Sequence, residues 1–486
     1  MSDQIEAGCC GPATTSFETP AQTPQAGAKE VAPRGEPPVV VIGAGPVGLA
    51  AAAQLVERGL DFLVLEAGDR VGASIREWGH VGLFSPWRYC TDAAARRLLE
   101  ASGWTAPDPD GLPTGAQLVQ DYLVPLAALP QIAPRVRTGS RVEAITRAGY
   151  DRVRSAGRES APFVVRVRRA DGTAEKVLAR AVVDASGSWT SPNVLGATGL
   201  PADGEASAAA WISHSLPDVL GADRKDFAGK HTLVAGAGHS AATTLIALAE
   251  LAEQEPGTKV TWAIRGGDAS RTYGGGQADE LPARGRLGTL VHHLVTTGKI
   301  TLLTGFFTDE LIPQADSPDL GRVEVISRDP DGVEQRLTAD RIVTATGYRP
   351  DHSIASELRL ELESIMGTTP ALGPLIDPNQ HSCGTVPPHG VDELAHPEPG
   401  YYAIGVKSYG RAPTFLLATG FEQARSVVAA LAGDWEAARD VRLELPETGV
   451  CSSSNAVGLG TGISGGLLNL PLITADASVS GGSCCG

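Results

Sequence analysis

The chain has no Cys-x-x-Cys motif anywhere in its 486 residues. Its seven cysteines are either isolated or stand as adjacent pairs near the two ends. In a reducing compartment, cysteines with this distribution should be mostly free thiols.

The chain also lacks an excess of basic residues, a leader segment and an unbroken apolar run. Its formal net charge of −16 argues against nucleic acid or an anionic membrane surface as the main partner. Residues 1–3 are polar and acidic, without the basic and apolar regions of a secretory signal, so we expect a cytoplasmic protein. The apolar run at 39–56 is interrupted by glycines and a proline, which argues against a membrane span.

What the sequence does contain is the glycine fingerprint of dinucleotide binding, and it occurs twice. The first copy runs from Gly43 to Gly48 and the second from Gly236 to Ala241. Each copy follows a short apolar strand and precedes an apolar helix. Two copies in this context predict two nucleotides held face to face, as in an enzyme that passes a hydride from a nicotinamide to a flavin.

The segments after the two copies follow the same order. After the first copy we expect a helix to about residue 58, then strands at 62–65, 141–146, 163–167 and 182–184. After the second copy we expect a helix at 240–253, then strands at 260–264, 323–327 and 342–344. Each series ends in a loop of small residues, which are Ala185, Ser186 and Gly187 in the first and Ala345, Thr346 and Gly347 in the second.

This repeat predicts an α/β fold with two Rossmann-like domains, each carrying an antiparallel β-hairpin insertion. We expect a disordered tail at 1–36 and a first domain built from residues 37–190 and 341–440. A second domain at 191–340 is inserted into the first, and a Gly- and Ser-rich tail follows at 441–486. The chain should return to the first domain through a strand at 401–405 and a helix from about Thr414 to residue 431.

In the first copy, each glycine has a separate task. Gly43 permits the tight turn, Gly45 lets the backbone approach a pyrophosphate, and Gly48 lets the helix pack close to the sheet. The phosphates then lie at a helix N-terminus, beside Ala44 and Pro46, where free N–H groups favour anions. Glu66 ends the next strand, where a carboxylate can accept both ribose hydroxyls and repel a 2′-phosphate. This site suits FAD, with NAD as the alternative.

The second copy has Gly236, Gly238 and Ala241 at the corresponding positions. The strand after its helix ends in Arg265 rather than in an acid, and Arg271 follows shortly after. Because a guanidinium can bind a 2′-phosphate through paired hydrogen bonds, this site favours NADPH over NADH. The alternative is that both arginines are solvated loop charges. His239 and Ser240 lie at the pyrophosphate turn, where they either contact phosphate or cap the helix.

With these motifs the chain resembles the two-dinucleotide-binding-domain flavoproteins, in particular the flavin-containing monooxygenase-like group, over about residues 38–432. The resemblance implies FAD in the first site and NADPH in the second. The motif at 345–351 matches the family's second signature, which links the domains, and the loop at 185–187 resembles its counterpart on the FAD side. The stretches 78–89, 381–390 and 405–415 resemble flavoproteins of arsenic-resistance operons, which implies that Gly405 approaches the flavin ring and ribityl chain.

The sequence departs from this family in two places. Monooxygenases of this group carry a Phe-x-Gly-x-x-x-His signature, and the stretch 208–214 keeps the histidine, His214, but lacks the Phe and the Gly. Disulfide reductases of related build place a redox cysteine pair beside the flavin, and no such pair occurs in this sequence.

Candidate catalytic residues follow from position and chemistry. Arg88 and Lys407 can stabilise negative charge on a reduced flavin, although Arg88 also suits a pyrophosphate contact or a surface ion pair. Cys383 lies on a stretch that approaches the flavin, where it is either a reactive thiol or inert packing. The adjacent thiols Cys9-Cys10 and Cys484-Cys485 are soft ligands that can hold a metalloid such as trivalent arsenic. The alternative for both pairs is that they are incidental cysteines in disordered tails.

Together these features predict an FAD- and NADPH-dependent oxidoreductase of the flavin monooxygenase-like class. Its small-molecule substrate would carry a soft nucleophilic centre, sulfur or trivalent arsenic, which connects the enzyme to arsenic resistance. Two alternatives stay open. One is an NADPH-dependent thiol or metalloid reductase that uses the tail cysteines, and the other is a metalloid-binding redox sensor with slow turnover. The sequence is compatible with a homodimer.

Overall fold

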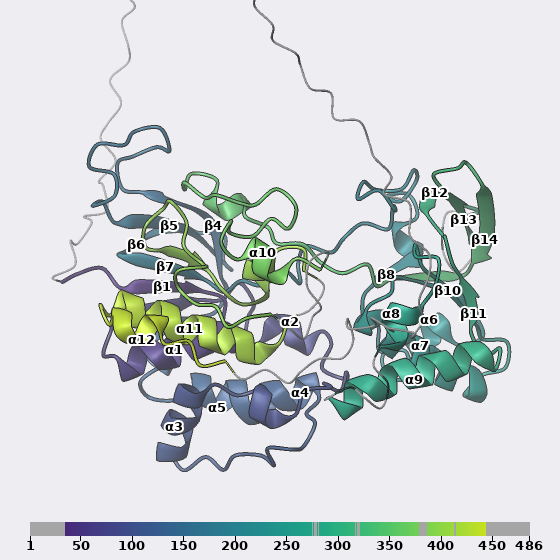
Figure 1. Cartoon of the computed structure of the whole chain (residues 1–486), viewed down its shortest axis with the longest axis horizontal. Coiled ribbons are helices and arrows are strands. Elements are labelled where there is room, and N and C mark those ends of the chain that lie inside the picture. Colours follow the sequence, from purple (N-terminus) through teal and green to yellow (C-terminus); the bar gives the residue numbers. More distant parts are fainter. Residues whose placement is uncertain are drawn as a thin grey trace, which may run out of the picture.

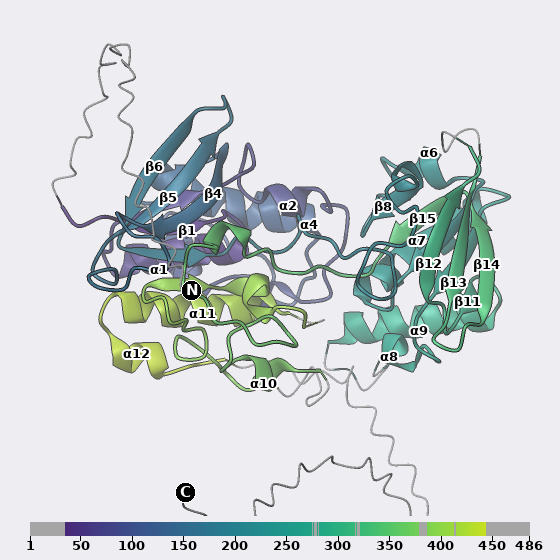
Figure 2. The same cartoon turned by 90° about the horizontal axis from the view of Figure 1, so that it is seen from above.

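The computed structural model describes residues 35–443 except 275, 277, 278, 280, 316, 318–320, 379–385, 413 and 414. The predicted tails therefore lie almost wholly outside the described residues, and so do Cys9, Cys10, Cys383, Cys484 and Cys485. The described residues form two α/β lobes, which lie side by side in Figure 1 and in the turned view of Figure 2.

The first lobe is built on a five-stranded parallel sheet of order β16-β7-β1-β2-β3. Its strands are β1 (Val39–Ile42), β2 (Phe62–Leu65), β3 (Val136–Arg137), β7 (Ala181–Asp184) and β16 (Tyr401–Ala403). The central strands are runs of apolar residues because both faces of this sheet are covered. The short apolar strand predicted before the first glycine copy is β1, and the strand predicted at 62–65 is confirmed residue for residue as β2.

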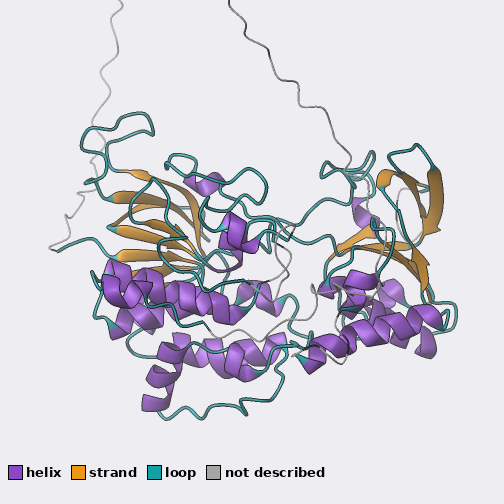
Figure 3. Cartoon of the chain, in the orientation of Figure 1, coloured by secondary structure: helices purple, strands orange, loops and turns teal. Residues whose placement is uncertain are grey.

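Helices cover one face of this sheet and a second, antiparallel sheet covers the other, as Figure 3 shows. The helices are α1 (Pro46–Glu57), α3 (Ala93–Ala101) and α11 (Leu417–Leu431), and the antiparallel sheet holds β4 (Ser140–Arg147), β5 (Phe163–Arg169) and β6 (Ala174–Ala179). Val39 and Val41 of β1 pack against the helices, whereas Val40 and Ile42 pack against the antiparallel sheet. The smaller helices are α2 (Ala73–Arg76), α4 (Gly115–Gln117), α5 (Val124–Ala127), α10 (Gly373–Ile376) and α12 (Trp435–Arg439).

The second lobe repeats this plan with a parallel sheet of order β11-β10-β9-β15-β8. Its strands are β8 (Ile212–His214), β9 (His231–Ala235), β10 (Lys259–Ala263), β11 (Thr301–Leu303) and β15 (Arg341–Thr344). Four helices belong to this lobe: α6 (Arg224–Phe227), α7 (His239–Gln254), α8 (Ser270–Tyr273) and α9 (Pro282–Thr296). A separate antiparallel sheet holds β12 (Thr308–Pro313), β13 (Val323–Arg328) and β14 (Glu334–Ala339). The two sheets differ in where their edge strand comes from along the chain. In the second lobe β8 precedes the glycine loop, whereas in the first lobe β16 lies far beyond it in sequence.

The predicted α/β fold, with one Rossmann-like lobe inserted in the other and a hairpin sheet in each, is confirmed by this topology. Two boundaries are corrected. Strand β15 pairs with β9 of the second lobe, so the chain returns to the first lobe after Thr344 and not at residue 341. Helix α11 begins at Leu417, three residues later than predicted. Within the described ranges, no helix has both the length and the hydropathy for crossing a bilayer.

The chain passes between the lobes twice, and the two passages pair with each other. The backbone N–H of Asn193 donates to the Gly347 carbonyl at 2.9 Å, and that of Arg349 donates to the Ser191 carbonyl at 3.0 Å. The Asn193 side-chain amide also donates to the Thr346 carbonyl at 2.9 Å. We call residues 189–193 and 346–349 the linker ribbon, because they form a short two-stranded connection between the lobes.

A buried charge cluster fastens the antiparallel sheet of the first lobe to the segment before β16. The carboxylate of Glu398 accepts the Nε–H of Arg147 at 2.7 Å and an N–H of Arg158 at 2.5 Å, and all three side chains are at most 3% exposed. Burial alone would raise the pKa of Glu398, but the Arg359 backbone N–H and the two guanidinium groups hold it below its usual value. Glu398 is therefore ionised at neutral pH.

We expect Glu398→Gln to lower the free energy of unfolding by about 3 kcal/mol, because two buried guanidinium groups lose their counter-charge. Urea unfolding at pH 7 measures the change. Since folding lowers the Glu398 pKa, its contribution is fully present above the unfolded value of about 4.3 and is lost as the pH falls through the folded pKa. The difference between wild type and variant should therefore shrink below about pH 4.

The matched control is Asp392→Asn, which breaks an ion pair with Arg439 in which both side chains are more than half exposed. This change should cost less than about 1 kcal/mol. Equal effects of the two substitutions would contradict a special role for Glu398.

Candidate active site

One cavity of about 650 Å³ is lined by residues of both lobes. The first glycine loop contributes Gly43, Gly45 and Pro46, and the second contributes His239 and Ser240. The cavity lies at the carboxyl ends of parallel strands, where open α/β sheets hold their ligands. The structure thus brings the two predicted nucleotide loops to a single space.

The first glycine loop has two glycines fixed by packing and one that faces open space. A Cβ on Gly43 would lie 2.7 Å from the Ala185 carbonyl oxygen, and one on Gly48 would lie 2.0 Å from the Gly43 carbonyl oxygen. A Cβ on Gly45 would meet no atom of the protein within 4 Å. This open cradle at the N-terminus of α1 is the shape and the electrostatic environment that a pyrophosphate requires.

The second glycine loop divides its positions in the same way. Gly236 has a φ of +132°, and its Cβ would lie 2.2 Å from the Ala345 carbonyl oxygen. Gly238 faces open space, as Gly45 does. The third position is Ala241, whose methyl group is fully buried. Both small-residue loops, at 185–187 and at 345–347, therefore lie against the glycine turns with which the sequence associates them.

Glu66 lines the cavity, and its carboxylate is held by two backbone groups. Its Oε2 accepts the Ala44 N–H at 2.7 Å and its Oε1 accepts the Gly68 N–H at 2.8 Å. A carboxylate has about four lone-pair positions, so two hydrogen bonds leave capacity for ribose hydroxyls. The position predicted for ribose recognition is thus both oriented and directed at the cavity.

His239 is the first residue of α7, and it is neutral. Burial, followed by the charge of Arg284, lowers the pKa of His239 to about 4. Its ring packs against Phe84 of the first lobe, with ring centroids 4.8 Å apart. Because the imidazole carries no charge at pH 7, attraction of a phosphate at this loop falls to the backbone N–H groups and the dipole of α7.

Arg265 and Arg271 lie outside the residues that line the cavity, and both are exposed. Arg265 follows β10 and donates from Nη1 to the Ala197 carbonyl at 2.8 Å. A guanidinium has five N–H donors, so this contact orients Arg265 without saturating it. Arg265 is therefore positioned at the strand end that reads the adenosine ribose in this fold.

Lys407 lines the cavity, but its charge is matched by a buried carboxylate. Its Nζ donates to Asp184 Oδ2 at 2.6 Å and to Ser186 Oγ at 2.9 Å, and Asp184 also accepts the Tyr401 hydroxyl at 3.0 Å. Burial would raise the pKa of Asp184, but the Lys407 ammonium holds it below its usual value. This ion pair, whose charges cancel, joins the end of β7 to the segment that follows β16. Lys407 therefore holds the two segments together, in addition to its predicted role of stabilising negative charge on a reduced flavin.

Arg88 is not brought to the cavity. Its guanidinium pairs with Asp110, and the Arg88 side chain is half exposed. The segment around Trp87 turns the Arg88 side chain outward. Arg88 therefore forms a surface ion pair, which was one of the alternatives from the sequence. The prediction that it lies at the flavin is corrected, because Arg88 does not line the cavity.

Gly405 lines the cavity, and a buried polar network holds its backbone. With a φ of +73°, Gly405 donates its N–H to Gln423 Oε1 at 2.7 Å. The Gln423 amide nitrogen in turn lies 3.0 Å from His389 Nε2. Since His389 Nδ1 lies 3.1 Å from the Pro387 carbonyl, it carries the proton, and Nε2 accepts from Gln423. This network was not predicted, because its members are polar residues without a motif.

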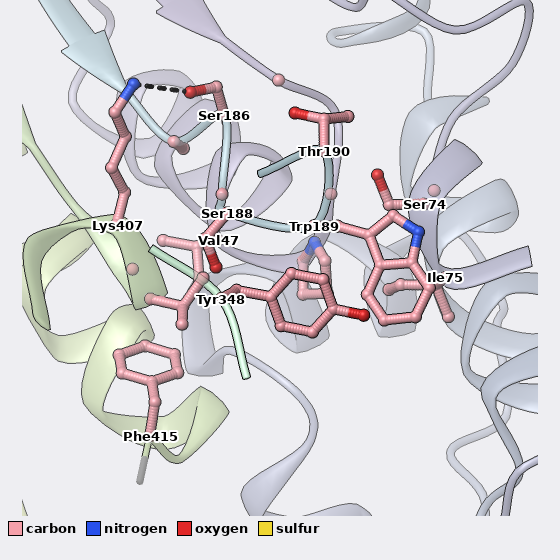
Figure 4. Close-up of a pocket in the computed structure, with 18 of the residues that line it drawn as sticks. Val47, Ser74, Ile75, Ser186, Ser188, Trp189, Thr190, Tyr348, Lys407 and Phe415 are labelled. Carbon is pink, nitrogen blue, oxygen red and sulfur yellow. Dashed lines mark hydrogen bonds between the residues drawn. The ribbon is translucent and has the colours of Figure 1, made fainter. Parts of the chain in front are cut away.

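Aromatic side chains line much of the cavity. They are Trp78, Phe84, Trp189, Tyr348 and Phe415. Figure 4 shows Trp189, Tyr348 and Phe415. Trp78 begins the stretch 78–89 that the sequence resemblance singled out, whereas Trp189 was missed although it follows the small-residue loop by two positions. Asp184 was also missed, although it ends a strand next to that loop, which is the place where polar residues face a ligand in this fold.

A metal centre is not part of the described site. The described residues hold no group of three or more His, Cys, Asp or Glu side chains arranged around an ion. The predicted soft-metalloid ligands Cys9, Cys10, Cys484 and Cys485, and the catalytic candidate Cys383, lie outside the described residues.

The chain is similar in sequence to known oxidoreductases. The sequence profile of the pyridine nucleotide-disulphide oxidoreductases matches residues 40–372. Indole-3-pyruvate monooxygenase YUCCA1 of Oryza sativa subsp. japonica is 33% identical over 208 residues, which is 42% of this chain and 43% of that protein. The chain therefore spans less than half the length of this curated relative.

Solved structures share the fold. Bacillithiol disulfide reductase Bdr (YpdA) of Bacillus cereus superposes with a TM-score of 0.60 at 20% identity, covering 82% of this chain and 99% of that one. The cadaverine monooxygenase DfoA of Erwinia amylovora, solved with FAD, gives a TM-score of 0.58 at 14% identity, covering 85% of this chain and 98% of that one. At these identities the likeness concerns the fold alone.

The two open-facing glycines provide a matched pair of substitutions. At Gly45 and Gly238 the backbone suits alanine, with φ of −82° and −91°, and the added Cβ meets no protein atom. We expect Gly45→Ala to lower the bound flavin content severalfold, because the methyl enters the phosphate space. We expect Gly238→Ala to keep the flavin and to raise the dissociation constant of the nicotinamide nucleotide severalfold.

Flavin absorbance per protein and titration with the reduced nucleotide measure these effects, and unchanged thermal unfolding confirms that each variant folds. Each variant is the control for the other. If both substitutions impair the same nucleotide, the assignment of one loop to each nucleotide is wrong.

Proposed function

The chain belongs to the pyridine nucleotide-disulphide oxidoreductase family. From the sequence motifs and the likeness to a monooxygenase we propose that it is a flavin monooxygenase-like enzyme acting on a soft nucleophilic atom. It is an oxidoreductase that uses FAD and NADPH. Our proposal concerns the reaction and the substrate, which is a small molecule that presents sulfur or trivalent arsenic.

The observation that carries this proposal is the single cavity lined by both glycine loops. A flavin held by the first loop and a nicotinamide held by the second would share one space. When bound, the two cofactors supply hydride transfer and the activation of oxygen. The protein supplies the position of each and the dielectric environment around them.

The residues of the chain divide this work. The N-termini of α1 and α7 bind phosphates through backbone N–H groups, and Glu66 binds ribose hydroxyls. Gly405, held by Gln423, presents its backbone to the first cofactor without a side chain in the way. The aromatic side chains that line the cavity would exclude water from the reacting region, which suppresses oxidation of NADPH without product formation.

The chemistry of Cys90 favours oxygenation over a thiol relay in the described part of the site. Cys90 is the free cysteine among the described residues, and it lines the cavity. Burial raises the pKa of its thiol to about 12, and the thiol donates to the Ser85 carbonyl at 3.4 Å. Because the thiolate is the nucleophilic form, this cysteine is inert. The link to arsenic resistance rests on the sequence resemblance and on the cysteine pairs of the tails.

The second candidate is an NADPH-dependent reductase of thiols or metalloids in which cysteines outside the described residues relay electrons. The family description and the fold shared with a bacillithiol disulfide reductase favour it. The metalloid-binding redox sensor with slow turnover is a third reading, and the rate of flavin reduction under saturating NADPH distinguishes it from both enzymes.

Product analysis separates the two enzyme functions. The flavin is reduced anaerobically with NADPH and mixed with oxygen, with or without arsenite or an organic sulfide. For oxygenation we expect one arsenate or sulfoxide, one water and one NADP⁺ for each NADPH and O₂ consumed. If all the oxygen appears as hydrogen peroxide, and NADPH is instead consumed when a disulfide is added, oxygenation is wrong and the reductase is supported.

Arg265 should determine the preference between the two nicotinamide nucleotides. We expect Arg265→Ala to raise the KM for NADPH by about tenfold to a hundredfold, because one or two charged hydrogen bonds to the 2′-phosphate are lost. The KM for NADH, which lacks that phosphate, should change less than twofold.

Steady-state kinetics with both nucleotides test this prediction. Lys225→Ala removes an exposed cation in α6 and serves as the control for a general change of charge. Equal increases in both KM values for the Arg265 variant would show that the residue supports the lobe and does not read the phosphate.

A further inference from the structure

Each of the two segments of the linker ribbon carries one aromatic side chain that faces the other segment. The rings of Trp189 and Tyr348 are stacked, with centroids 4.9 Å apart and planes inclined by 30°. Both side chains line the cavity. The stack therefore joins the two strands of the ribbon at the edge of the cavity, and Figure 4 shows the two rings side by side.

Each ring is also bonded to a different lobe. The Nε1–H of Trp189 donates to Glu77 Oε2 at 2.7 Å, and Glu77 directly follows α2 of the first lobe. The Tyr348 hydroxyl donates to the Ser215 hydroxyl of the second lobe, directly after β8. Burial, with a contribution from the Glu77 charge, raises the pKa of Tyr348 to about 12, so the phenol keeps the proton that it donates.

Ser215 is held in a conformation that its backbone disfavours. Its φ is +59°, and it is the one non-glycine residue with a positive φ among those described. Its N–H donates to the Thr344 carbonyl at 3.0 Å, and its own carbonyl accepts the Thr244 hydroxyl of α7 at 3.3 Å. Such strain persists only where the surroundings fix the residue, and it gathers at functional sites. Ser215 thus connects Tyr348 to the helix that carries the second glycine loop.

We propose that Glu77, Trp189, Ser215 and Tyr348, which we call the linker cluster, fix the orientation of the lobes and so set the reach of the nicotinamide to the flavin. These are positioning residues, because they act through the lobes that hold the cofactors. The role rests on the proposed use of NADPH and FAD in one cavity. It adds a determinant of hydride transfer that neither glycine loop contains.

The physical argument is one of geometry. Lobes joined by two short passages rotate against each other unless contacts between them resist it. Hydride transfer needs the reacting atoms about 3–3.5 Å apart, and a misplacement of about 1 Å can cost a hundredfold in rate. A stack bonded to both lobes resists such rotation at the edge of the cavity that both lobes line.

The test uses substitutions that keep the rings and remove single hydrogen bonds. Trp189→Phe loses the bond to Glu77, and Tyr348→Phe loses the bond to Ser215. We expect each variant of the full-length enzyme to reduce its flavin about tenfold more slowly at saturating NADPH under anaerobic conditions. Flavin content, thermal unfolding and reduction by dithionite should stay as in wild type. The radius of gyration from small-angle X-ray scattering, measured without nucleotide, should increase.

Two controls distinguish positioning from general structural damage. Trp104→Phe loses an Nε1–H bond of 2.9 Å to the Asp121 carbonyl at a site outside the cavity lining, and it should behave as wild type. Glu77→Gln keeps a hydrogen-bond acceptor for Trp189 and should retain most of the wild-type rate of flavin reduction. Glu77→Ala removes the acceptor and should reduce the flavin as slowly as Trp189→Phe.

The outcomes separate this inference from the proposed function. If wild type is reduced by NADPH and both ring variants are reduced equally fast with an unchanged radius of gyration, the linker cluster does not position the lobes. If the reduction rate is unchanged but product formation falls, the rings belong to a substrate wall and the inference is overturned. If NADPH does not reduce the wild-type flavin, the proposed function fails, and the scattering comparison alone decides on the cluster.

Discussion

The architecture depends on one backbone contact that occurs twice, between a glycine turn and the carbonyl of a small residue at the end of the neighbouring strand. Strands β1 and β7 are parallel neighbours, and so are β9 and β15, so their carboxyl ends emerge at one edge of each sheet. The turn at Gly43 must then pass against Ala185, and the turn at Gly236 against Ala345. Because no Cβ fits between them, glycine is required. The same two alanines lead into the linker ribbon, so this contact shapes each nucleotide loop and also determines where the lobes are joined.

The lobes are alike in build and unlike in the charges that they offer. The first presents the Glu66 carboxylate beside its loop, and the second presents the Arg265 guanidinium beyond its corresponding strand. In the cavity between them, the charge of Lys407 is matched by Asp184 and His239 is uncharged, so neither side chain offers a free positive charge. In the proposed function, helix N-termini would attract the phosphates, and the Glu66 and Arg265 charges would distinguish one ribose from the other. This division of tasks would let one repeated fold hold two different nucleotides.

Sequence patterns predicted those parts of the fold that depend on neighbours along the chain. The four apolar residues of β1 and the glycines that follow them have meaning within a short window, and the structure confirms the strand. Patterns failed where a boundary or a side-chain direction depends on distant residues. Strand β15 joins the second lobe because β9, more than 100 positions earlier, provides its hydrogen-bonding partner. Arg88 turns outward because Asp110 lies there, and no local pattern specifies that pairing.

The sequence by itself determined the doubled α/β plan and the two glycine loops, because turn geometry and apolar periodicity are encoded locally. Only the tertiary structure decided which distant residues meet at the cavity. The Lys407–Asp184 pair and the Gln423–His389 network form within the first lobe, and the Trp189–Tyr348 stack forms between the two passages that join the lobes. Each contact depends on side-chain direction and on the closure of long loops. A single sequence carries no local signal for either of these, so these contacts could be identified only from the folded chain.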